Sequence, residues 1–170
     1  MTIKLINQDI TSLKVDAIVN AAQNDLMGGG GIDGVIHRKA GKELDTECKT
    51  LHGCKTGYAK ITKGYNLPAK YIIHTVGPDC RQVKDKNLQE YLLTRSYLNS
   101  LRLAKANNIH SIAFPAISAG TYQFDKPQSV QIATTIVHNW LKNNPDYDLD
   151  VYFDIIDPEL VKLYEKALHK

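Results

Sequence analysis

The stretch VDAIVNAAQ at residues 15–23, followed by GGGGIDG at residues 28–34, decides the fold of this 170-residue chain. A short apolar strand ends in the amide of Gln23, and a lone carboxylate, Asp33, follows four successive glycines. Four adjacent glycines are costly, because each loses more backbone entropy on folding than any other residue. Glycine-rich backbone that leads into a helix favours phosphate, through its free N–H groups and the helix dipole. The pattern therefore predicts a diphosphate site with an amide and a carboxylate at its edge.

The glycine run also has a plain interpretation, because glycine-rich segments occur as flexible surface loops. Its spacing excludes two known nucleotide-binding motifs. The run lacks the Gly-Lys-Ser/Thr ending of a P-loop, and its glycines do not follow the Gly-x-Gly-x-x-Gly spacing of a dinucleotide fingerprint. A ligand loop of another kind and a flexible loop both stay open at this point.

Composition is that of an ordinary globular chain with a weak positive charge. Hydrophobic residues make up 43% of it and the formal net charge is +3, with no long basic run, so nucleic acid is not an expected partner. The three cysteines, Cys48, Cys54 and Cys80, lack Cys-x-x-Cys spacing, so we expect reduced thiols and neither a disulfide framework nor a metal site. Residues 1–10 lack the apolar core of a signal peptide, and no apolar run approaches the roughly 20 residues of a membrane helix. We therefore expect a cytoplasmic protein.

Short β-like segments alternate with helical patterns along the chain. The expected strands, rich in branched and aromatic residues, are 3–6, 17–19, 59–62, 71–76, 111–114 and 151–156. The expected helices are 34–40, 88–106, one with an apolar stripe over 130–141 and one with a stripe over 160–168. Nearly continuous apolar runs, as at 112–114, are typical of strands covered on both faces. The alternation predicts an α/β layered fold, and the absence of a visible repeat or linker predicts one domain over residues 1–170.

A second loop of small residues follows the predicted strand 111–114. It reads PAISAGTYQF at residues 115–124, so small residues again precede an aromatic side chain that can cover a sugar or a base. In open α/β sheets, ligands bind outside the carboxyl ends of the strands, where such loops gather. The two loops together predict a clamp on one diphosphate, although packing explains Tyr122 and Phe124 equally well.

Other polar residues have structural explanations beside their functional ones. Asp9 suits the cap of a turn or short helix, and its alternative role is an acceptor for an exocyclic amine such as that of adenine. His37 and His74 are acid–base candidates by residue type, but their apolar surroundings in sequence favour buried structural histidines. Cys48 and His52, spaced i and i+4, are weak grounds for a nucleophile.

Several motifs together resemble one known family. They are QDIT at 8–11, the stretch 15–22, LMGGGGIDGVIH at 26–37 with Ala40-Gly41, LPAK at 67–70, IHTVGP at 73–78, YLNSLRL at 97–103, AFPAISAG at 113–120 and LYE at 163–165. The glycine loop, the HTVGP run and the FPAIS run are jointly very specific. On these motifs the chain resembles macrodomains, and among them the bacterial O-acetyl-ADP-ribose deacetylase and mono-ADP-ribosyl hydrolase branch.

The resemblance implies a three-layer α/β/α sandwich with a mixed central sheet and an ADP-ribose cleft. Since no metal-ligand set is visible in the sequence, we expect no cofactor or metal. By position, Asp9 and Ile10 would hold adenine, and Asn20 would form a hydrogen bond with the proximal ribose. The proximal ribose is here the sugar on the far side of the diphosphate from adenine. Asp33 would position or activate the attacking water. The two loops would wrap the diphosphate and the distal ribose with Gly29, Gly30, Gly31, Ile32, Ser118, Ala119, Gly120, Thr121 and Tyr122.

The chain departs from the family pattern at two main positions. The family's hydrolases read Asn-Ala-Ala-Asn where this chain has Asn20-Ala21-Ala22-Gln23. The longer glutamine shifts its amide by roughly 1 Å, and misplacements of that order lower rates by about 100-fold. Ile156 falls where related enzymes often carry an aromatic beside adenine, which removes stacking on the order of 1 kcal/mol. Ala119 and Gln123-Phe124 differ slightly from the usual second loop.

The sequence thus predicts an enzyme that hydrolyses esters of ADP-ribose, either O-acetyl-ADP-ribose or mono-ADP-ribose on acidic protein side chains. Asp33, Asn20 and Gln23 are the candidate catalytic residues, and the loop N–H groups with the diphosphate fix the sugar for attack. The alternative is a module that reads ADP-ribose without cleaving it, which Gln23 favours. A nucleotide-phosphate protein outside the family is a third possibility. Asp33 also suits the N-cap of a helix at 34–40, a role compatible with catalysis.

Overall fold

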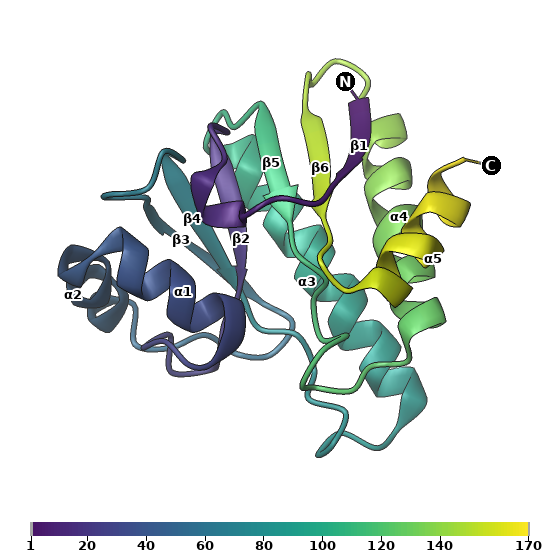
Figure 1. Cartoon of the computed structure of the whole chain (residues 1–170), viewed down its shortest axis with the longest axis horizontal. Coiled ribbons are helices and arrows are strands. Elements are labelled where there is room, and N and C mark those ends of the chain that lie inside the picture. Colours follow the sequence, from purple (N-terminus) through teal and green to yellow (C-terminus); the bar gives the residue numbers. More distant parts are fainter. Residues whose placement is uncertain (1, 170) are drawn as a thin grey trace.

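The computed structural model describes residues 2–169 and shows a six-stranded sheet flanked by helices (Figure 1). The strands are β1 (Thr2–Ile6), β2 (Ala17–Ala21), β3 (Ala59–Lys63), β4 (Tyr71–Thr75), β5 (Ser111–Phe114) and β6 (Asp150–Asp154). The helices are the short 3-10 turn η1 (Ile10–Ser12), then α1 (Gly31–Ala40), α2 (Lys42–Thr50), α3 (Lys86–Ala106), α4 (Lys126–Asn143) and α5 (Pro158–Leu168). The alternation predicted from the sequence is confirmed.

The sheet is mixed, as the resemblance implied. Its strand order is β1-β6-β5-β2-β4-β3, and β3 pairs antiparallel with β4, whereas every other pair is parallel. The central strand β2 has β4 on one side and β5 on the other, all three running in the same direction. Their carboxyl ends therefore meet at one edge, where loops from distant parts of the sequence come together.

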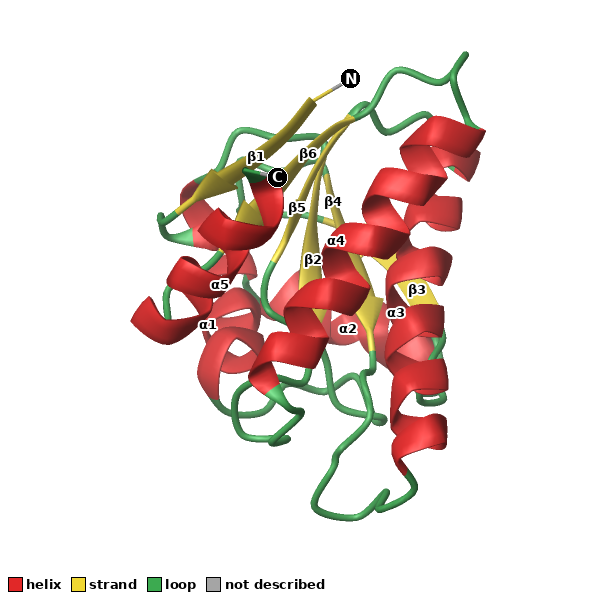
Figure 2. Ribbon diagram, turned by 90° about the vertical axis from the view of Figure 1, so that its right-hand side faces the viewer, coloured by secondary structure: helices red, strands yellow, loops and turns green. Residues whose placement is uncertain are grey.

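Alternate side chains of the central strands enter two separate cores. Ile18 of β2 faces Ile72 of β4 in register, and both pack against the apolar side of α1 and α2. The next pair, Val19 and Ile73, belongs to the core that α3, α4 and α5 complete. Strands covered on both faces are apolar at nearly every position, which explains the nearly continuous apolar runs. Figure 2 shows the strands between helices on either side.

Helix α1 begins at Gly31, earlier than the start at Gly34 that the sequence predicted. Gly28 and Gly31 have φ values of +89° and +58°, in the left-handed region that favours glycine. A Cβ on Gly34 would lie 2.4 Å from the carbonyl oxygen of Gly29, so the loop packs directly on the helix. These demands on backbone shape contradict the flexible-loop interpretation. Since the N-cap residue is Gly30, the interpretation of Asp33 as a cap is also wrong.

The three helices that complete the second core all begin at aspartate caps. The side chains of Asp85, Asp125 and Asp157 accept hydrogen bonds from backbone N–H groups in the first turns of α3, α4 and α5. Each cap satisfies donors that a helix start otherwise leaves free. Across residues 2–169, no helix combines the length and the apolar character needed to cross a membrane.

Candidate functional site

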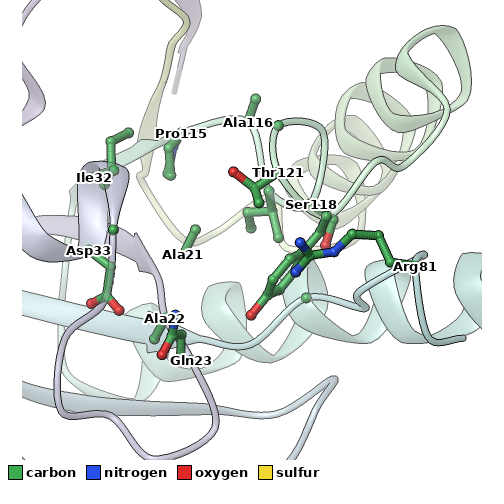
Figure 3. Close-up of a pocket in the computed structure, with 16 residues that line it drawn as sticks. Ala21, Ala22, Gln23, Ile32, Asp33, Arg81, Pro115, Ala116, Ser118 and Thr121 are labelled. Carbon is green, nitrogen blue, oxygen red and sulfur yellow. The ribbon is translucent and has the colours of Figure 1, made fainter.

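A cleft of about 370 Å³ lies at the carboxyl ends of β2, β4 and β5 (Figure 3). Its walls are residues 21–23 at the end of β2, residues 30–33 in the glycine loop and α1, Gly77 and Arg81 after β4, and residues 115–118 and 120–122 after β5. The volume lies in the range of roughly 300–1,000 Å³ that is typical of small-molecule sites. The two small-residue loops thus face one cleft, as the sequence predicted.

Most of the predicted diphosphate residues line this cleft, namely Gly30, Gly31, Ile32, Ser118, Gly120, Thr121 and Tyr122. Ala119 instead packs in the core, with 2% of its surface exposed. The first N–H groups of an α-helix have no partner within the helix, and they carry the positive end of its dipole. The cleft wall formed by the start of α1 is therefore suited to an anion.

Asp33 places a buried carboxylate at one end of the cleft, its side chain 4% exposed. Its Oδ1 accepts a 2.8 Å hydrogen bond from Asn20 Nδ2, and His37 Nε2 lies 3.4 Å from the same oxygen. Oδ2 has no hydrogen-bond partner within residues 2–169. Burial raises the pKa of Asp33, an effect that the Asn20 hydrogen bond and His37 partly oppose. A carboxylate with a raised pKa and a free oxygen is suited to take up a proton.

Asn20 lies beneath the cleft and does not line it. Its side chain is fully buried, and Nδ2 donates to Asp33 and lies 3.1 Å from His74 Nδ1. The register of the sheet explains these contacts, because Asn20 and His74 face each other on β2 and β4. Asn20 therefore fixes the orientation of the Asp33 carboxylate, whereas the sequence predicted a contact to sugar.

The two buried histidines differ in their surroundings. His74 has Asn20 on Nδ1 and the Thr62 hydroxyl 2.9 Å from Nε2, and burial lowers its pKa to about 3, with a further contribution from His37. Its structural role is confirmed. His37 instead places Nδ1 2.7 Å from Asp45 Oδ1 and Nε2 beside Asp33. The i, i+4 spacing of Asp33 and His37 on one helix was the signal that could have revealed this contact.

Gln23 lines the cleft close to Asp33, as Figure 3 shows. Its amide lies directly over Gly29, since a Cβ on that glycine would lie 2.4 Å from Gln23 Nε2. The absence of a side chain at Gly29 thus makes room for the longer amide at the end of β2. Gly29 supports Gln23 and is not itself part of the cleft wall.

Arg81 is a cleft residue that the sequence reasoning missed. Its Nε and Nη2 donate to the two carboxylate oxygens of Asp79 at 2.9 and 2.8 Å, and the guanidinium lies 5.7 Å from the ring centroid of Tyr122. The backbone N–H of Cys80 also donates to the Tyr122 carbonyl at 2.8 Å. The loop after β4 therefore adds a cation to the cleft, beside the aromatic ring that the loop after β5 supplies. No periodicity or motif spacing marks Arg81 in the sequence.

The predicted adenine residues lie outside this cleft, after the neighbouring strands β1 and β6. Asp9 caps η1 by accepting from Thr11 N at 3.0 Å and Thr11 Oγ1 at 2.6 Å, and Lys39 Nζ lies 2.9 Å from its other oxygen. The Thr11 hydroxyl, with Lys39 next in importance, lowers the pKa of Asp9 to about 2. The cap interpretation is confirmed. Ile10 is buried, whereas Ile156 is 55% exposed.

Fold and site define an α/β/α domain with a glycine-walled cleft and a buried carboxylate at its end. The Macro domain family matches residues 19–133, and this chain belongs to that family. A macro domain-containing protein of Methanosarcina mazei is 51% identical over 168 residues, 99% of this chain and 88% of that protein. The family resemblance and the predicted fold class are thereby confirmed.

Two further relatives carry more specific descriptions. The human ADP-ribose glycohydrolase MACROD2 is 47% identical over 169 residues, 99% of this chain. That match covers 39% of the human protein, so the chain spans about two fifths of its length. The solved structure of the Trypanosoma brucei macrodomain in complex with ADP-ribose has a TM-score of 0.90 at 38% identity, covering 98% of this chain and 68% of the other.

Proposed function

We propose that this chain binds ADP-ribose and hydrolyses its esters, namely O-acetyl-ADP-ribose or mono-ADP-ribose on acidic protein side chains. The observation that carries the proposal is the Asp33 carboxylate, held by Asn20 at the end of a cleft suited to a diphosphate. The trypanosomal relative is described in complex with ADP-ribose, and the human relative is named as a glycohydrolase. We propose further that residues 1–170 act as one domain, with ADP-ribosylated proteins as partners. The three free cysteines fit a cytoplasmic location.

Binding would place the two ends of the ligand at different parts of the sheet edge. The diphosphate would lie between the first turn of α1 and the loop 118–122, with Arg81 adding positive charge. Adenine would extend toward Asp9 and Ile10 at the end of β1 and Ile156 after β6. The proximal ribose, which carries the ester, would then lie beside Asp33 and Gln23.

Hydrolysis then needs one oriented water molecule. The Asp33 carboxylate accepts a hydrogen bond from this water and draws off its proton as the water oxygen attacks the ester carbonyl. The proton passes to the departing group, which leaves free ADP-ribose and a carboxylic acid. The raised pKa makes Asp33 a better base near neutral pH, and Asn20 keeps the carboxylate in one orientation.

The second candidate function is an ADP-ribose reader with little or no turnover. Gln23 favours it, because the family's hydrolases carry a shorter asparagine and the glutamine amide lies over Gly29. Gln23→Asn restores the shorter amide while leaving the diphosphate loops unchanged. If the longer side chain holds the amide away from the ribose, the exchange raises turnover by up to about 100-fold.

Single-turnover rates on both ester substrates separate the two functions. Activity in the wild-type protein that disappears in Asp33→Ala supports the enzyme. A silent wild type with an active Gln23→Asn supports a reader derived from a hydrolase. If both are silent while calorimetry still shows ADP-ribose binding, the assignment as an ester hydrolase is refuted. Binding of ADP-ribose no tighter than AMP would refute the placement of the proximal ribose in this cleft.

A further inference from the structure

Three potential metal ligands meet close to Asp33, and none of them lines the cleft. His37 of α1, Cys48 of α2 and His74 of β4 each offer one ligand atom, and these atoms all lie within 4.8 Å of one another. All three residues are buried. Among residues 2–169, no other group of three histidine, cysteine or acidic side chains is gathered in this way. Cys48 has no part in the hydrolysis proposed above.

His37 is already arranged as metal-binding histidines are. Its Nδ1 lies 2.7 Å from Asp45 Oδ1, and its Nε2 is buried without a hydrogen-bond partner within the described chain. Histidines that bind metals usually donate the other ring N–H to a carboxylate, which fixes the ring and the tautomer. With the Nδ1 hydrogen on Asp45, Nε2 presents a lone pair only 3.4 Å from the Asp33 carboxylate. A cation at this point would satisfy both groups.

His74 and Cys48 supply the other two positions. His74 accepts from Asn20 at Nδ1 and donates to Thr62 from Nε2, so a bound ion would replace the Asn20 contact. Burial, reinforced by Asp45 and Glu47, raises the pKa of the Cys48 thiol to about 12, so the ion must displace that proton into solvent. Cys48 also borders a surface cavity that Met27 and His52 line, but its own side chain is fully buried, so the wall of this cavity must open for an ion to enter without passing through the ligand cleft.

We propose that His37, Cys48 and His74 form a buried site for a borderline-soft divalent ion, of which Zn²⁺ suits the ligand set best. Two imidazoles and one thiolate are typical zinc ligands, and Asp33 or a water molecule completes a tetrahedron. Ligand atoms around zinc lie roughly 3.3–3.8 Å apart, so ligand atoms that are now up to 4.8 Å apart must approach by up to about 1.5 Å. Asp33 and Asp45 offset the charge of the ion.

The ion would inhibit, and this consequence rests on the proposed hydrolase function. Zn²⁺ bound to His37 and His74 separates Asn20 from His74 and attracts Asp33, which then no longer holds the attacking water. The reaction itself does not use this ion. Zinc would therefore act on the enzyme from a site beside its catalytic carboxylate.

Titration of the full chain with Co²⁺, followed by its absorption spectrum, tests the site without any substrate. We expect one equivalent per chain, a thiolate-to-cobalt band in the near ultraviolet, release of one proton, and displacement by Zn²⁺. Cys48→Ser removes the near-ultraviolet band, whereas Cys54→Ser, which alters a second buried cysteine, keeps it. Asp45→Asn leaves the three ligands in place and weakens Co²⁺ binding by about 10- to 100-fold.

The result that overturns the site is a wild-type spectrum without the thiolate band, or a band that persists in Cys48→Ser. His37→Gln serves as the second ligand variant if Cys48→Ser does not fold, and it too must lose tight Co²⁺ binding. Inhibition is measured in a separate assay. We expect Zn²⁺ to suppress hydrolysis by the wild type, a chelator to restore that activity, and Cys48→Ser to stay active in the presence of Zn²⁺. If the chain binds Co²⁺ as expected but the metal-free protein hydrolyses neither ester, the proposed ion site stands and the proposed hydrolase function is refuted.

Discussion

Two aspartates at the same edge of the sheet, Asp33 and Asp9, have opposite environments. The Asp33 side chain is 4% exposed and that of Asp9 is 49% exposed. Burial raises the pKa of Asp33, whereas the Thr11 hydroxyl and the Lys39 ammonium lower the pKa of Asp9 to about 2. Asp33 therefore resists ionisation, and Asp9 is an anion throughout the physiological range.

The contrast shows how one residue type supports two proposed roles. A general base must take up a proton during the reaction, and it does so best when its pKa lies near the pH of the solution. A raised pKa brings Asp33 closer to that condition at neutral pH. A fixed acceptor for an amine works best when it never takes up a proton. Each environment follows from position: Asp33 is a buried residue of α1, and Asp9 is the exposed cap residue of η1.

The largest expected effect is on turnover at the Asp33 end. Asp33→Ala removes the carboxylate that orients the water, so the single-turnover rate falls by about 100- to 10,000-fold. ADP-ribose affinity changes little, because the diphosphate loops are intact. Asp25→Ala is the matched control, since Asp25 lies on the loop that leads into α1 and its carboxylate accepts from the Met27 N–H. An Asp25→Ala loss equal to that of Asp33→Ala would mean that loop shape, and not the base, is being measured.

The next effect is on affinity at the Asp9 end. Asp9→Ala removes a charged acceptor worth about 1.5–3 kcal/mol, which weakens ADP-ribose binding by about 10- to 150-fold in calorimetry. Turnover at saturating substrate stays the same. Lys39→Ala removes the ion pair but keeps the carboxylate, so it serves as the control. If Asp9→Ala lowers thermal stability and leaves affinity unchanged, Asp9 is a cap and nothing more.

The smallest effect is on stability. As pH rises, the contribution of Asp9 to folding stability increases, whereas the contribution of Asp33 decreases. The folded-state pKa of Asp9 is depressed, so its stabilisation is present above about pH 4 and is lost as pH falls toward 2. The folded-state pKa of Asp33 is raised, so its contribution is present at acid pH and is lost as pH rises through that value.

Melting curves of Asp9→Asn and Asp33→Asn measure these signs against the wild type. Asp9→Asn is less stable than the wild type at pH 5, and the gap closes by pH 2. The melting temperature of Asp33→Asn rises relative to that of the wild type as pH rises above about 4, the range in which the buried Asp33 of the wild type loses its contribution. Parallel pH dependences of the two variants would contradict the contrast.

Much of the fold could be predicted from residue patterns. The runs around Ile72 and Ile112 indicated strands covered on both faces, and small residues after β2 and β5 indicated a shared ligand edge. The start of α1 was misplaced because glycine is a poor helix former, and a sequence pattern does not show that Gly31 enters the helix with positive φ. The N-cap assignment of Asp33 failed for the same reason.

The site was harder to predict, because its geometry depends on how deeply each side chain is buried and on loops that are far apart in the sequence. The resemblance implied that Asn20 contacts the ribose, and no pattern indicated that Asp33 and His74 would use its amide. Arg81 reaches the cleft because Asp79 and Tyr122 hold it there; the Asp79 contact is local, but the contact with the distant Tyr122 leaves no motif in the sequence. The cluster of His37, Cys48 and His74 arises in the same way, from three elements that only the folded chain brings together.

The most direct test of Asp33 as the base is the pH dependence of the single-turnover rate on O-acetyl-ADP-ribose, with spontaneous hydrolysis subtracted. If Asp33 draws the proton from water, the rate rises with pH through the raised pKa of Asp33 and then levels off. Asp33→Asn abolishes the rise and leaves a low, flat rate. A wild-type profile that is already flat, or the same profile in Asp33→Asn, would show that another group activates the water.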